Sequence, residues 1–240
     1  KEMEDGCDVT SIEVEARIKR MEGLIFQGLG VQKEILWANI FHDTIRGSEW
    51  LPENISFSPG RWALGYPGLY LLYRALNEMR PSAILELGLG QSTQITGSYV
   101  KYQTQCGNMC RHYVVEDNQN WIRFFCHNNS IPEATEIIRL DMKEMEFDIN
   151  IIGKTKINMY NGFKERLEGE KFDLIFIDAP WGSEEYSRID VANILPGCLT
   201  DRFMIIMDDC NRKGELRTVR LMQDILNESG IAYCQGIYEG

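Results

Sequence analysis

Short apolar runs alternate with helical patterns over most of the chain after Ser82. The apolar runs predict β-strands at residues 83–87, 112–115, 136–140, 172–177, 203–207 and 231–237. Between these runs, hydrophobic residues recur every three to four positions, which is typical of amphipathic helices. Strands that alternate with helices favour a parallel sheet with right-handed crossovers. We therefore predict an α/β fold with a doubly wound, mostly parallel sheet, and an extra hairpin around residues 149–159.

The N-terminal part follows a different pattern. Residues 10–46 carry apolar side chains at helical spacing, so they predict a helix, and Gly28-Leu29-Gly30 is expected to divide it because each glycine costs about 1 kcal/mol in a helix interior. A loop rich in Gly, Pro, Ser and Trp follows. The organisation predicted is a helical extension with a loop over residues 1–66 and an α/β domain over 67–240. The extension packs on its own domain, covers a sheet edge, forms a lid or joins two copies in a homodimer.

Composition narrows the class of partner. The formal charge is 25 − 36 = −11, which argues against a general nucleic-acid binder. No apolar run approaches the roughly 18–20 residues of a membrane-spanning helix. The cysteines are irregularly spaced, which favours free thiols and a cytoplasmic location. Cys106 and Cys110 are the only closely spaced cysteines. The alternative is that they bind zinc, with His112 and His127 nearby.

Acidic residues stand near the end of the first predicted strand and directly after each of the next four. They are Glu86 within the first strand, then Glu116-Asp117, Asp141, Asp178 and Asp208-Asp209. Small ligands bind beyond the carboxyl ends of strands in such sheets, so these acids are expected to share one edge. After the first strand, Gly88 and Gly90 allow a sharp turn. A dinucleotide fingerprint would need a third glycine where this chain has Thr93, yet an NAD(P)-binding oxidoreductase stays an alternative.

The pattern Glu86-x-Gly88-x-Gly90, with Glu116 one strand later and Asp178 after the fourth strand, resembles class I S-adenosylmethionine (SAM)-dependent methyltransferases over residues 82–237. The segments 62–76, 177–182 and 207–212 are similar to uncharacterised bacterial members. The resemblance implies a Rossmann-like methyltransferase sheet. Because sheets of that family end with an antiparallel strand, residues 231–240 are either arranged differently or the last hairpin lies outside this sequence.

The resemblance also implies where the donor would bind. SAM carries a sulfonium and an ammonium, which suit carboxylates, whereas a pyrophosphate would suit helix N–H groups and positive charge. Glu116 would accept the ribose hydroxyls. The full set of implied donor-binding residues is Glu86, Gly88, Gly90, Ser92, Glu116, Asp117, Asp141, Met142 and Asp178.

Asp178 and Asp208 are the predicted catalytic residues. Together with Asp209 they resemble the acids that hold Mg²⁺ in metal-dependent catechol-type O-methyltransferases, where the ion lowers the pKa of an acceptor hydroxyl. Two departures are visible: Asp209 stands where those enzymes usually carry Asn, and Trp181 stands at the place of their Lys. In the alternative, Asp208 or Asp209 caps the helix that starts near Gly214, and Asp178 is a lone general base or a hydrogen-bond acceptor.

Trp181, Arg188 and Arg212 are the predicted substrate-pocket residues, the two arginines as anchors for an acidic acceptor. Surface ion pairs with Glu184, Glu185 or Glu215 are the alternative for the arginines. The function that these patterns favour is methyl transfer from SAM to a hydroxyl of a small molecule or glycan. A methyltransferase-like module that binds a ligand or partner without turnover is the other class considered.

Overall fold

The computed structural model describes the whole chain except residues 1–5, 53–54, 56–62, 150–152, 183–184 and 239–240. Five parallel strands form its central sheet, in the order β3-β2-β1-β6-β7. These strands are β1 (Ala83–Leu87), β2 (Arg111–Glu116), β3 (Thr135–Arg139), β6 (Phe172–Ile177) and β7 (Leu199–Met207). The predicted α/β, doubly wound class is confirmed, and the order reverses between β1 and β6.

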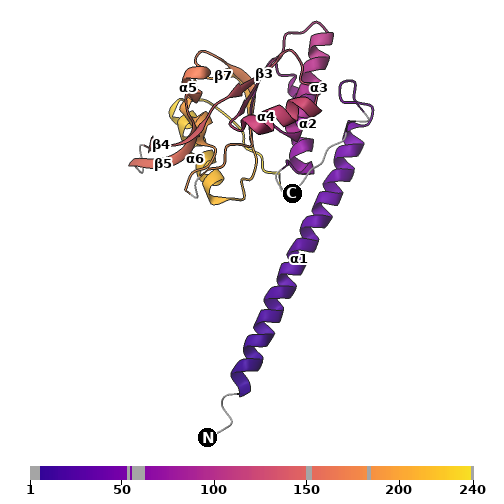
Figure 1. The fold of residues 1–240 in the computed structure, drawn as a ribbon, viewed down its shortest axis with the longest axis vertical. Coiled ribbons are helices and arrows are strands. Elements are labelled where there is room, and N and C mark those ends of the chain that lie inside the picture. The colour runs from indigo at the N-terminus through magenta and orange to yellow at the C-terminus, as the bar shows by residue number, and fades with distance from the viewer. Residues whose placement is uncertain (1–5, 53–54, 56–62, 150–152, 183–184, 239–240) are drawn as a thin grey trace.

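Helices cover both faces of the sheet (Figure 1). On one face lie α2 (Tyr66–Met79), α3 (Gln91–Gln105) and α4 (Gln119–Asn128). On the other lie α5 (Phe163–Arg166), the 3-10 helix η1 (Ile189–Asn193) and α6 (Lys213–Glu228). All five residues of β1 are buried because the strand is central and covered on both faces. This rigid centre fixes the loops that follow β1 and β6.

The predicted hairpin is present and longer than expected. Strands β4 (Met142–Ile149) and β5 (Gly153–Tyr160) pair antiparallel and form a separate two-stranded sheet. Ile157 and Met159 of β5 are buried in the core beside α6, so the hairpin is anchored on one strand.

Two predictions about secondary structure are wrong. Residues 231–238 form neither strand nor helix in the described part of the chain, so β7 is an edge of the sheet there. The N-terminal helix is not divided: α1 runs unbroken over Gly6–Ile45. Gly28 and Gly30 face open space, and their low helix propensity is outweighed by good helix formers on either side.

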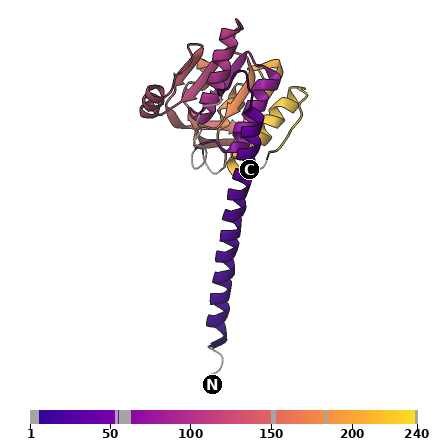
Figure 2. The same ribbon diagram turned by 90° about the vertical axis from the view of Figure 1, so that its right-hand side faces the viewer.

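The N-terminal region is joined to the domain at one end only. Phe41 and Ile45 near the end of α1, with Trp50 and Leu51 after it, share the core of α2 and α3. The rest of α1 projects away from the sheet (Figure 2). Within the predicted loop after it, Pro59, Gly60 and Trp62 lie outside the described residues. No helix in the described part of the chain combines the length and apolar character needed to traverse a membrane.

Candidate functional site

The loop between β1 and α3 is held tightly against its neighbours. Gly88 has φ +101°, and a Cβ there would lie 3.0 Å from the Cβ of Ala179, which follows β6. The amide of Gly88 donates to the carbonyl of Val115 on β2 (2.9 Å). Only glycine suits this conformation and this close approach. The turn predicted from the glycine pattern is therefore present at the point where the strand order reverses.

Glu86 is fully buried and its carboxylate is committed inside the protein. It accepts hydrogen bonds from the hydroxyls of Ser92 and Thr93, the latter at 3.0 Å, and lies 3.0 Å from Nε2 of His112. The hydroxyl of Thr93 also accepts from the amide of Gly90 (3.0 Å). Glu86 and Ser92 therefore position the loop on α3, and the donor-binding role that the resemblance implies for both stays a prediction.

Glu116 ends β2 and turns its carboxylate toward the same loop. Oε2 accepts from the amide of Leu89 (3.2 Å), and Oε1 accepts from the amides of Asp117 (3.0 Å) and Asn118 (2.9 Å). Burial raises the pKa of Glu116 above its usual value, and these amide donors oppose that shift. Since a carboxylate offers about four lone pairs, one acceptor position is left for a ligand hydroxyl.

Two aromatic side chains of α4, Trp121 and Phe124, lie beside the loop, and the sequence analysis did not name them as site residues. The indole N–H of Trp121 on α4 donates to the carbonyl of Leu89 (2.7 Å). Its ring stacks on Phe124 with centroids 5.5 Å apart, and both side chains are exposed. Two exposed aromatic residues on one helix face were the available sequence signal.

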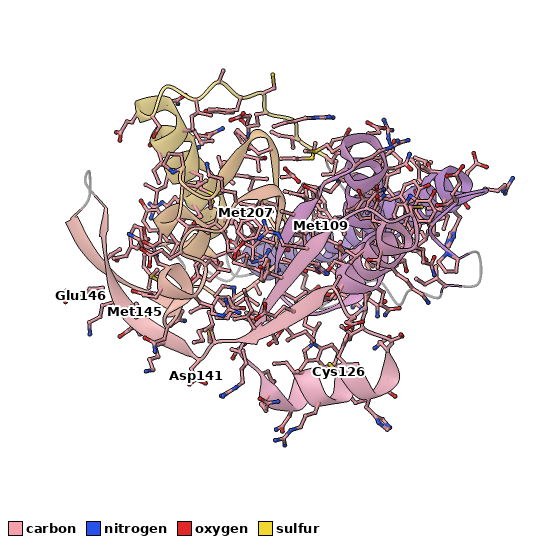
Figure 3. All side chains as sticks on the ribbon, turned by 90° about the horizontal axis from the view of Figure 1, so that it is seen from above. Met109, Cys126, Asp141, Met145, Glu146 and Met207 are labelled. Carbon is pink, nitrogen blue, oxygen red and sulfur yellow. The ribbon has the colours of Figure 1, made fainter. Side chains whose placement is uncertain are left out.

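Asp141 and Met142 come just after the carboxyl end of edge strand β3, where Figure 3 labels Asp141. The Asp141 side chain is exposed and pairs with Arg139 (2.5 Å). Met142 begins the β4–β5 hairpin and is also exposed. Within the described residues, no hydrogen bond or ion pair links either side chain to the glycine loop, so their place beside an adenine stays a prediction.

The three acids after β6 and β7 come together as predicted from the strand ends. One carboxylate oxygen from each of Asp178, Asp208 and Asp209 lies within 4.8 Å of the others. Arg188, which precedes η1, is inserted among them. Its Nη2 lies 2.7 Å from Asp209 Oδ2 and 3.1 Å from Asp178 Oδ1, and its Nη1 donates to the carbonyl of Asp208 (3.0 Å).

Arg188 therefore acts as an internal counter-ion, and its predicted part as an anchor for an acidic acceptor stays a prediction. Its side chain is only 7% exposed, and its donors are directed at carboxylates and a carbonyl of the chain. Arg212 is half exposed and pairs with Asp209 (2.9 Å). No side chain caps the start of α6, so the capping alternative for the acids is not seen there.

The acid cluster fits a divalent metal poorly. Its oxygens are close enough for an octahedral ion such as Mg²⁺. However, Arg188 already supplies a cation to Asp178 and Asp209, and a metal would leave this buried guanidinium without its partners. The alternative zinc site also fails: within the part of the chain searched, Cys106 and Cys110 belong to no metal-holding cluster.

A cavity of about 480 Å³ opens over the ends of β6 and β7. Asp178, Trp181, Arg188, Arg212 and Glu215 line it, and none of its lining residues comes from the glycine loop. The predicted pocket residues therefore do gather around one opening, with Trp181 64% exposed at its margin. Their part in binding an acceptor stays a prediction.

Asp178 has the titration behaviour of a general base. Burial raises its pKa to about 7; Arg188 opposes the shift, while Asp208 and Asp209 add to it. Burial likewise raises the pKa of Asp208. A carboxylate that titrates near neutral pH is well matched to accept a proton under physiological conditions.

Two buried polar side chains near this edge, Asp190 and Tyr160, were not predicted as site residues from the sequence. Asp190 in η1 accepts from the amide of Tyr160 (2.8 Å), but its Oδ2 and the Tyr160 hydroxyl have no hydrogen-bond partner in the described structure. Burial raises the pKa of Asp190 to about 7. An aspartate inside the apolar run Ile189-Asp190-Val191-Ala192 was the signal, since surface carboxylates rarely sit in such runs.

Comparison with known proteins gives little further information. No protein-family model matches the sequence, and no curated protein matches it. Among solved structures, the SAH-bound methyltransferase PaMTH1 of Podospora anserina is similar, with 20% identity and a TM-score of 0.40. The match covers 58% of this chain and 50% of that one, so the chain spans half the length of that methyltransferase. An overlap of this size carries no conclusion about activity.

Proposed function

We propose that this chain transfers a methyl group from SAM to a hydroxyl of a small molecule or glycan. One observation carries the proposal: the Glu116 carboxylate reaches the amide of Leu89 in the glycine loop, beside the reversal of strand order. An acid and a glycine turn thus meet where parallel sheets bind small ligands.

On the donor side, the charge of the edge favours a cationic ligand. Glu86 and Glu116 flank the loop and are held there by neutral hydroxyl and amide donors as well as by His112. A pyrophosphate would meet like charge here, which disfavours a nicotinamide dinucleotide. Glu116 would accept one ribose hydroxyl through its remaining lone pair, and the loop carbonyls would face the positive end.

On the acceptor side, Asp178 would act as general base. When bound, the donor supplies an activated methyl group, whose bond to sulfur breaks as its bond to the acceptor oxygen forms. The acceptor hydroxyl's proton moves to the Asp178 carboxylate, which titrates near neutral pH. Arg188 holds that carboxylate in place (3.1 Å), and Trp181 would border the acceptor at the mouth of the cavity. No metal takes part in this scheme.

The test combines donor binding with turnover. Isothermal titration with SAM, S-adenosylhomocysteine and NAD should show binding of the first two and none of the third. Release of labelled methyl to a panel of hydroxyl compounds should be unaffected by EDTA. Binding of NAD alone would support the oxidoreductase instead. Donor binding with no transfer above the rate of an Asp178→Ala variant would support the module without turnover.

A further inference from the structure

The projecting part of α1 carries large apolar side chains in open solvent. Six of them define what we call the α1 stripe, each between 49% and 61% exposed: Val14, Ile18, Met21, Ile25, Leu29 and Leu36. A 40-residue helix is about 60 Å long. Figures 1 and 2 show most of this length away from the domain. Large apolar side chains exposed along so much of one helix mark a site of association.

The stripe has a regular repeat. Val14, Ile25 and Leu36 are separated by 25 − 14 = 11 and 36 − 25 = 11 residues, and Ile18 and Leu29 by 29 − 18 = 11. Eleven residues make just over three full helical turns, so residues at this spacing stay on one face along α1. Leu24, Val31 and Ile35 form a second exposed row next to it. This is the spacing with which two long helices pack side by side.

The domain lies away from the stripe, so it does not block a second helix. Phe41 and Ile45 are buried against α2, and Trp37 contacts Tyr70 (ring centroids 5.3 Å apart). Phe41 comes five residues after Leu36 and therefore lies about 140° around the helix from it. Two copies can therefore join along the stripe with their domains on the outer sides.

The charges beside the stripe indicate the orientation. Arg17 flanks it on one side and Glu22 on the other, five residues later. In a parallel pair, Arg17 of one copy faces Glu22 of the other, and this occurs twice by symmetry. The polar positions around α1 mix Lys19, Arg20 and Lys33 with Glu15, Glu22 and Glu34, so the helix lacks the basic polar face with which helices bind anionic membranes. We propose that α1 joins two copies of this chain as a parallel, in-register helix pair.

The first test is the mass of the full chain in solution. Sedimentation equilibrium at micromolar concentration should give twice the chain mass for the wild type and the monomer mass for the double variant Ile25→Glu/Leu29→Glu. The matched control is Gln27→Glu/Gly30→Glu, which adds the same charge on the opposite face and should remain dimeric. Far-UV circular dichroism at fixed high concentration checks that the domain stays folded in each variant.

The second test is orientation. Val14→Cys and Leu36→Cys, each introduced alone, should give a disulfide between the two equivalent positions, identified by mass spectrometry of peptides. An antiparallel pair would link the two variants only when they are mixed. The proposal is overturned by a monomeric wild type, by three or more copies, by a stripe variant that keeps the dimer mass, by antiparallel cross-linking, or by a monomer whose stripe binds anionic phosphatidylserine vesicles.

Discussion

The two halves of the carboxyl edge hold their acids in different ways. Beside β1 and β2, Glu86 and Glu116 accept mostly from neutral amides and hydroxyls. Beside β6 and β7, Asp178 and Asp209 share one buried guanidinium, that of Arg188. In the first half, the carboxylates contact the glycine loop and the start of α3. The second half borders a cavity of about 480 Å³.

This difference assigns different tasks to similar residues. Neutral donors orient a carboxylate without cancelling its charge, so the first half keeps a negative potential for a cationic ligand. The Arg188 guanidinium cancels much of the charge in the second half, which then suits a neutral hydroxyl compound and one titrating carboxylate. Acids that occupy equivalent positions at the strand ends thus differ in their expected function, because some pair with neutral donors and others with a cation.

The largest effect is expected at Asp178. Replacing it by Asn removes the proton acceptor while keeping the shape, so methyl transfer should fall about 10²–10⁴-fold. Titration calorimetry separates this role from the donor binding that the resemblance also implies for Asp178: a base alone leaves the donor affinity unchanged, because Glu116 and the glycine loop are intact. In the wild type, the transfer rate should rise as the pH passes about 7, the pKa of this buried carboxyl.

The matched control is Asp209→Asn in the same cluster. Asp209 has φ +60°, which Asn also tolerates, and it pairs with Arg188 (2.7 Å) without being assigned the proton. Its transfer rate should fall much less and keep the same pH profile. Equal losses in the two variants would contradict the assignment of Asp178 as base.

The next effect is on stability and concerns Arg188. Arg188→Met leaves the partly buried Asp178 carboxylate without its counter-ion and leaves Asp209 with Arg212 alone, so the free energy of unfolding should fall by about 3 kcal/mol. Urea unfolding measures it. Arg212→Met removes a half-exposed partner of the same Asp209, and should cost about 1 kcal/mol or less. Similar losses would mean that Arg188 is not the internal counter-ion.

The last effect is the pH dependence of stability at Asp190. Its pKa rises from 3.8 to about 7 on folding, so the folded state binds the proton more tightly. Its contribution is complete below pH 3.8 and is lost as the pH rises through about 7. Asp190→Asn should flatten the decline in the free energy of unfolding between pH 4 and 8, while Asp201→Asn on the surface should leave it unchanged.

Periodicity in the sequence was sufficient for the sheet and for the acids that follow its strands. It failed at residues 231–237, where Ile231 and Tyr233 alternate because they pack on the core, and no neighbouring strand pairs with them. The sequence also could not predict which side chain or amide pairs with each acid. Arg188 meets Asp209 across 21 residues of sequence, a contact set by tertiary packing and by no local pattern.

The central claim is that the Glu116 carboxylate, turned onto the glycine loop, binds the donor. The direct measurement is the dissociation constant of S-adenosylhomocysteine for the wild type and for Glu116→Gln, with Glu136→Gln on the neighbouring strand as the control. The account predicts binding to the wild type, a loss of about ten-fold or more in Glu116→Gln and none in the control. Equal affinity in all three proteins, or no binding by the wild type, would contradict it.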